Sequence, residues 1–175
     1  MRARVCSILV AAVAHVATVA GASIPSDFEL KARFFPGAGW PPGGPEPWRL
    51  TISSDGKALQ ETYTFPGERE VKHIKTIQLS QRALTDIVAA FQRINFFTLP
   101  KRMIEPFGEP GHQMGITLTL SSSGHSHTVT FSVPGTIRDR PAARRFWQAW
   151  SVVARKVRSP NKSKEFDYWL HYNPL

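Results

Sequence analysis

The sequence is nearly free of cysteine, since Cys6 is the only one among 175 residues. A single thiol excludes a disulfide framework, a zinc site built on cysteines and a paired redox centre. The sequence also lacks a Gly-x-Ser-x-Gly nucleophile elbow, a glycine-rich nucleotide loop and a His-Glu-x-x-His metalloprotease helix. These absences predict that the protein is not an enzyme and needs no cofactor.

Acidic residues are scarce relative to basic ones. The chain has 13 Asp and Glu against 22 Lys and Arg, which gives a formal net charge of +9. A field of this sign attracts anionic partners. The length excludes a multidomain enzyme, and a hydrophobic fraction of 42% is enough for the core of one globular domain.

The first 22 residues have the pattern of a secretory signal peptide. Arg2 and Arg4 precede an apolar run over residues 5–19, and the small residues Ala20, Gly21 and Ala22 close it. The run is shorter than the roughly 20 apolar residues that a bilayer requires. We therefore expect a secreted or periplasmic protein with no transmembrane span in the mature chain, whose net charge would be +7 without the two arginines.

Alternation of apolar and polar residues predicts several strands in the remaining chain. A first strand is expected over 28–35, and a loop rich in proline and glycine follows to Pro47. A hairpin is expected from a strand over 48–53, a turn over 54–57, and a return strand that bears Leu59, Tyr63 and Phe65. Residues 71–79 can continue the sheet, and the clearest hairpin runs over 116–133 with a turn at 122–124.

Two segments have the 3.6-residue periodicity of amphipathic helices. Ser80 is a suitable N-cap for the first helix, whose apolar face would comprise Leu84, Ile87, Val88, Phe91 and Ile94. The second would begin near Asp139 to Pro141 and bury Ala143, Phe146, Trp147, Trp150, Val153 and Val157. The segment between Pro100 and Gln113 is expected to contain no regular structure.

The order of these elements predicts an α+β fold, an antiparallel sheet built from hairpins with two amphipathic helices packed on one face. Residues 23–158 would form this single domain. Residues 159–175 would form a basic and then aromatic C-terminal tail.

The strongest functional signal is a basic stretch in the second helix and the start of the tail. Residues 138–164 contain nine cations and only one acid, Asp139. The candidate binding residues among them are Arg140, Arg144, Arg145, Arg155, Lys156 and Arg158. They would meet a protein or an anionic polymer of the cell envelope, and not a specific nucleic acid. The alternative is a solvated helix face that keeps the protein in solution.

Two tryptophans outside the predicted elements are further candidates for binding. Trp40 lies in the loop rich in proline and glycine, and Trp169 lies in the aromatic tail. An exposed aromatic ring on a stiff segment can serve as a contact surface. Such segments also serve as plain connections.

Three histidines are candidates for a metal site. His125 and His127 lie two residues apart on a predicted strand, so both side chains point to one face, and His112 precedes that hairpin. Imidazoles in this spacing can hold zinc or copper. The alternative is that the two rings cover the core edge beside Val129 and Phe131.

Two stretches resemble known domains. Residues 47–56 resemble the first hairpin of small exported bacterial domains. From Ile77 to Phe131, the capped helix, the run Phe96-Phe97-Thr98-Leu99-Pro100 and the strand pair containing Gly124-His125-Ser126-His127-Thr128-Val129 resemble the small emfourin-like proteins. That resemblance implies inhibition of a metallopeptidase, but it carries over no contact residues. The residues themselves favour a non-enzymatic exported binding domain that acts on a protein or a polyanion at the envelope or outside, and peptidase inhibition is the alternative.

Overall fold

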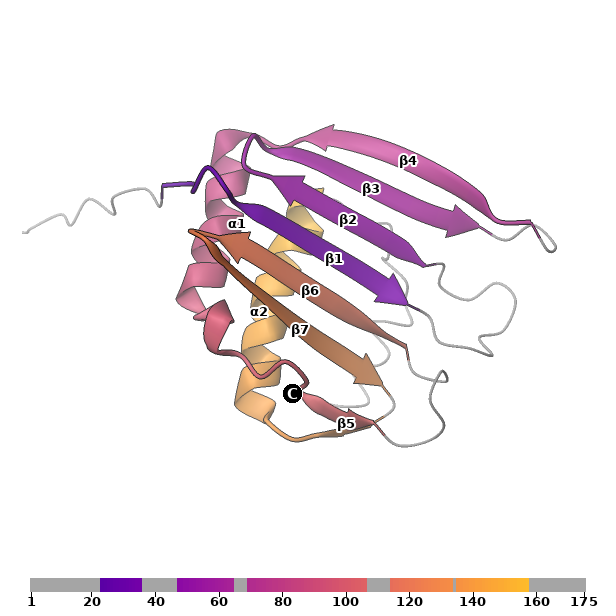
Figure 1. The fold of residues 1–175 in the computed structure, drawn as a ribbon, viewed down its shortest axis with the longest axis vertical. Coiled ribbons are helices and arrows are strands. Elements are labelled where there is room, and N and C mark those ends of the chain that lie inside the picture. Colours follow the sequence, from indigo (N-terminus) through magenta and orange to yellow (C-terminus); the bar gives the residue numbers. More distant parts are fainter. Residues whose placement is uncertain (1–22, 36–46, 65–68, 107–113, 134, 158–175) are drawn as a thin grey trace, which may run out of the picture.

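The computed structural model describes residues 23–35, 47–64, 69–106, 114–133 and 135–157. Several predicted features lie outside these ranges: the signal peptide, Trp40, His112, Arg158, and the tail with Trp169. Within the ranges, six strands form one antiparallel sheet in the order β4-β3-β2-β1-β6-β7. Together with two helices they confirm the α+β class (Figure 1).

The first strand of the chain occupies the middle of this sheet. Strand β1 (Glu29–Phe35) pairs with β2 (Trp48–Ser53) on one side and with β6 (Met114–Ser122) on the other. Strands β3 (Lys57–Thr64) and β4 (Val71–Gln78) extend the sheet beyond β2, and β7 (His125–Val133) extends it beyond β6. Strand β6, which follows the first helix in the chain, therefore pairs with the first strand, β1.

Both helices lie on the same side of the sheet. Helix α1 (Gln81–Arg93) and helix α2 (Arg140–Val157) are seen behind the strands in Figure 1. The sheet residues that face them alternate along each strand, as a pleated strand requires: Leu30, Ala32, Phe34, Trp48, Leu50, Ile52, Ile116, Leu118, Leu120, Val129 and Phe131, all buried. We call the two helices the helical layer and the opposite side of the sheet the open face.

The helix boundaries follow from local capping. The Ser80 side chain accepts a hydrogen bond from the Ala83 amide (3.2 Å), and Ser80 is the N-cap of α1 as predicted. Asp139 does the same for α2, where its Oδ1 accepts from the Ala142 amide at 2.8 Å. The five residues predicted for the apolar face of α1 are all buried. The carboxylate and hydroxyl caps thus fix where each amphipathic repeat begins.

The prediction that nothing regular lies between Pro100 and Gln113 is wrong. Strand β5 (Ile104–Pro106) pairs antiparallel with β8 (Gly135–Ile137) in a separate two-stranded sheet. Just before it, the Thr130 amide donates to the Lys101 carbonyl (2.8 Å), so this segment also runs along the edge of β7. Three residues are too few to show a two-residue period. Beside the pair, the buried Met103 accepts a backbone hydrogen bond from the Arg138 amide at 3.0 Å.

Side chains of strand β3 point alternately to the helical layer and to the open face. Ala58 and Gln60 face the helical layer, and the Gln60 amide nitrogen donates to the Val157 carbonyl at 3.1 Å. This bond satisfies a carbonyl in the last turn of α2. Leu59 and Tyr63 consequently lie on the open face, where both are half-buried.

Asp27 ties the turn between β6 and β7 to the start of the described domain. Its two carboxylate oxygens accept hydrogen bonds from the Ser123 amide (2.8 Å) and the Gly124 amide (2.6 Å). Ser123 and Gly124 both have positive φ, at 53° and 75°, so their amides converge on one acceptor. The Gly124 and Ser123 amides hold the pKa of Asp27 below its usual range.

We expect Asp27→Asn to destabilise the protein at neutral pH and to have little effect in acid. A carboxyl with a lowered pKa stabilises the fold above its ordinary value of about 4, and this contribution disappears as the pH falls through the lower folded-state pKa. The measurement is the urea midpoint of wild type and variant between pH 2 and pH 7. Glu70→Gln, at an exposed carboxylate, is the control, and a midpoint difference for Asp27→Asn that stays constant with pH would contradict the assignment.

Candidate functional site

The helical layer carries most of the predicted basic residues in the described part of the chain. Arg140, Arg144 and Arg155 are exposed on α2. Arg145 is half-buried, and its guanidinium donates to the Ile94 carbonyl at the end of α1 (3.3 Å). Lys156 pairs with Asp86 of α1 at 2.7 Å. Of these five candidates, three are left for a partner and two join the helices to each other.

Helix α1 adds to this charge at two positions that its periodicity places toward water. Arg82 and Arg93 are exposed on its outer face. Because Lys156 meets residue 86 and Arg145 meets residue 94, the helices run antiparallel, side by side, and their outer faces form one surface. The helical layer therefore presents a set of exposed arginines: Arg82, Arg93, Arg140, Arg144 and Arg155.

The histidines of β7 take part in packing. The His127 Nε2 atom lies 2.8 Å from the Leu99 carbonyl, and its ring meets Phe96 edge-on at 5.7 Å. A carbonyl only accepts, so Nε2 carries the proton and is occupied. His125 is exposed and lies edge-on to Phe97 at 6.2 Å. Across the described ranges no three His, Cys, Asp or Glu side chains are grouped as a metal site requires.

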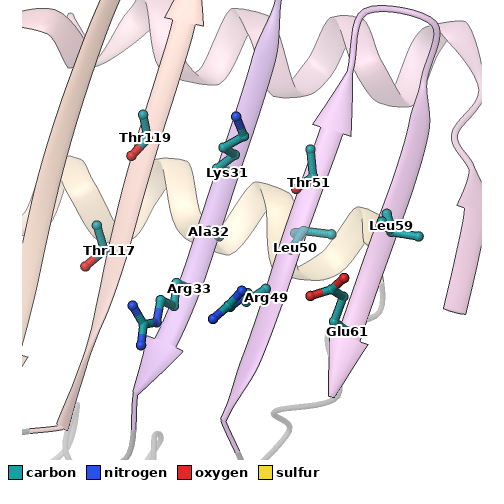
Figure 2. A pocket seen from close by; sticks show the side chains of 10 residues that line it. All are labelled: Lys31, Ala32, Arg33, Arg49, Leu50, Thr51, Leu59, Glu61, Thr117 and Thr119. Carbon is teal, nitrogen blue, oxygen red and sulfur yellow. The ribbon is translucent and has the colours of Figure 1, made fainter. Parts of the chain in front are cut away.

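The open face contains a hollow that the sequence did not predict. Arg33 of β1 stands directly opposite Arg49 of β2 and Thr117 of β6, and Lys31 stands opposite Thr51 and Thr119 in the next row. Figure 2 shows these side chains together, with both arginines leaning toward the β6 side of their own strands. The hollow has a volume of about 390 Å³ and is completed by Ala32, Leu50, Leu59 and Glu61. We call it the Arg33–Arg49 hollow.

Two acids near this hollow, Glu61 and Glu29, have basic partners, and a third, Glu70, lines an adjoining hollow with Arg33 and Arg49. Glu61 accepts from Lys72 (2.6 Å) and from the Tyr63 hydroxyl (2.8 Å), and these bonds hold the pKa of Glu61 below its usual range. Glu29 pairs with Lys31 at 2.5 Å. The guanidinium of Arg49 lies 5.6 Å from the centre of the Tyr63 ring, a cation–π contact.

The signal for this hollow is present in the sequence but incomplete. The alternations Lys31-Ala32-Arg33 and Arg49-Leu50-Thr51 each predict one polar strand face. What places Arg33 against Arg49 is the β1–β2 register. The long connection over residues 36–46 gives no turn chemistry from which that register could be derived.

The two edges of the main sheet differ. At β7 the segment Lys101–Arg102 covers part of the edge. At β4 no further strand is paired within the described part of the chain, and Ile74 has 62% of its surface exposed. The Leu79 amide donates to Gly56, so by the alternation of an antiparallel ladder every second residue from Lys72 to Gln78 directs its backbone groups outward.

Comparisons with known proteins do not assign this chain to a family: no family model matches it, and neither does any curated protein. In the described ranges, neither helix combines the length and apolar character that crossing a membrane requires.

Proposed function

We propose that the protein is a non-enzymatic, exported binding domain that holds an anionic partner, a polymer or an acidic protein of the cell envelope or its surroundings, on its helical layer. The observation that carries this proposal is the row of exposed arginines on the outer faces of α1 and α2. The localisation comes from the signal-peptide pattern of residues 1–22.

The acids of the helical layer form their closest contacts with other groups, although Asp86 also interacts electrostatically with Arg82. Asp86 is paired with Lys156, and the bond lowers the pKa of the Asp86 carboxyl. Asp139 caps the N-terminus of α2. A surface with more exposed arginines than acids raises the local concentration of anions within about a Debye length, near 8 Å at physiological salt. Binding on this surface should therefore weaken steeply as salt rises.

We expect the double variant Arg144→Gln/Arg155→Gln to elute from a heparin column at a clearly lower salt concentration than wild type. Each lost contact also removes about one unit from the slope of log affinity against log salt, by analogy with polyanions such as DNA. Lys57→Gln/Lys75→Gln is the matched control, because it removes two exposed charges from strands β3 and β4 and leaves the helices unchanged. Equal elution of the double variant and the control would contradict the proposal.

Inhibition of a peptidase is the second candidate function. It is implied by the resemblance to emfourin-like proteins and is favoured by one observation, the unpaired edge of β4 with the exposed Ile74. An extended edge can pair with another chain through its outward backbone groups. A stoichiometric metallopeptidase retained by the protein at high salt would favour this function. Loss of all partners as salt rises would favour the helical layer.

A further inference from the structure

The geometry points to a second binding site, on the opposite side of the molecule from the helical layer: the Arg33–Arg49 hollow binds the phosphate group of a small phosphate monoester. Its residues come from three adjacent strands of the open face. It shares no residue with the arginines of α1 and α2, so it stands or falls independently of the function proposed above.

Positive charge predominates around the hollow. Lys31 is neutralised by Glu29, and Lys72 is neutralised by Glu61. Neither Arg33 nor Arg49 forms a hydrogen bond or ion pair through its side chain in the described ranges, while Arg49 lies over the Tyr63 ring and directly opposite Glu61. The hollow therefore presents two adjacent arginines without an ion pair in these ranges, with Glu61 opposite Arg49 and Glu70 lining an adjoining hollow beside both.

Arg33 and Arg49 form a like-charged pair across two neighbouring strands. Residues directly opposite on neighbouring antiparallel strands have Cβ atoms about 5 Å apart, and like charges in this relation destabilise a sheet. Here the pair sits on β1 and β2, in the interior of a six-stranded sheet, with Glu61 on the far side of Arg49. A doubly charged anion bound between the two guanidinium groups would attract both of them and offset their mutual repulsion.

The chemistry of the lining selects the ligand. A guanidinium group can bind two phosphate oxygens at once. A phosphate monoester carries close to two negative charges at neutral pH, so it matches the charge of two arginines better than a carboxylate ligand, which carries one. Thr51, Thr117 and Thr119 line the hollow. The Thr117 and Thr119 hydroxyls bond Thr130 (3.2 Å) and Thr128 (2.9 Å) of β7, so the Thr51 hydroxyl is the one assigned to polar groups of the ligand. A volume of about 390 Å³ is in the range of small-molecule sites.

The test is a titration of the purified protein with inorganic phosphate at pH 7.5, with chloride replaced at constant ionic strength. Saturable shifts of the Arg33 and Arg49 side-chain NMR signals are expected, and glycerol phosphate should give the same shifts. Binding to vesicles that contain phosphatidic acid, without binding of either soluble phosphate, would overturn the proposal because the ligand would be a lipid surface.

Three variants distinguish phosphate binding at this site from attraction to the net positive charge of the protein. Arg33→Gln and Arg49→Gln should each weaken phosphate binding about tenfold, as expected for loss of a charged hydrogen bond. Arg33→Lys keeps the positive charge but loses the guanidinium fork, so its affinity for phosphate should lie between those of wild type and Arg33→Gln. Lys57→Gln, an equal charge loss on the same face, should bind as wild type does, and equal weakening by this control would overturn the site.

Thermal melting distinguishes a lost ligand contact from a damaged fold. Without phosphate, Arg33→Gln should melt at the wild-type temperature or above it, because the like-charge pair is removed. Phosphate should raise the melting temperature of wild type and leave that of Arg33→Gln/Arg49→Gln unchanged. A phosphate-induced rise that is equal in both proteins would show that the anion binds elsewhere, and the proposal would fail.

Discussion

Replacing Trp48 with alanine should lower the free energy of unfolding by about 3–5 kcal/mol, the range found for large aromatic residues removed from cores. The Trp48 ring is 2% exposed and lies between two others. It stacks on Trp150 of α2 (centroids 5.3 Å apart) and on Phe34 of β1 (6.1 Å). Its removal would leave a cavity where the sheet meets the second helix.

The measurement is urea denaturation, read from the midpoint at constant slope. Trp48→Phe is the control: it keeps a ring in the stack and removes the indole N–H, which is buried and has no acceptor within the described ranges. A buried N–H without an acceptor costs about 1–3 kcal/mol, which partly offsets the smaller ring. A loss below about 1 kcal/mol for Trp48→Ala would show that α2 does not depend on this stack.

The parts of the fold that the sequence predicted are those in which the deciding interactions are local. The Ser80 side chain caps α1 by accepting a hydrogen bond from the amide three residues later. The turn at Ser123 and Gly124 joins β6 and β7, two paired strands in which apolar and polar residues alternate. In both cases the residues that set the structure are within one repeat of each other. Periodicity and turn chemistry are sufficient for such elements.

The parts that it did not predict depend on contacts between distant segments. Asp27 bonds two amides 96 and 97 residues away, and Gln60 bonds the carbonyl of Val157. The short β5–β8 pair has no period of its own. A sequence pattern identifies the face of a strand but not the strand that lies beside it.

The same limit applies to the candidate sites. The basic character of α2 could be read from the chain, but not that Arg145 and Lys156 would reach across to α1 and leave the other arginines exposed. The Arg33–Arg49 hollow could not be found, because each of its arginines is an ordinary polar residue on its own strand. Only the β1–β2 register makes them neighbours.

The second large effect is expected at Gly115 in β6. This glycine pairs with Ser132 of β7 and with Phe35 of β1. A Cβ atom placed there would collide with the Phe131 carbonyl oxygen and would lie 2.9 Å from both the Phe35 ring and the Ser132 Cα. Two of these three atoms belong to the backbone, so the ladder between β6 and β7 would have to move.

We expect Gly115→Ala to lower the free energy of unfolding by about 3 kcal/mol, at the upper end of the usual cost of overpacking. Urea denaturation checks this, with Gly124→Asn as the control: that position is open and its φ of 75° is one that asparagine tolerates. Removing the ring in Gly115→Ala/Phe35→Ala should not restore stability, because the Phe131 carbonyl remains in place. Full recovery in the double variant would show that only the flexible ring opposes a side chain at position 115, and that the β6–β7 backbone can accommodate one.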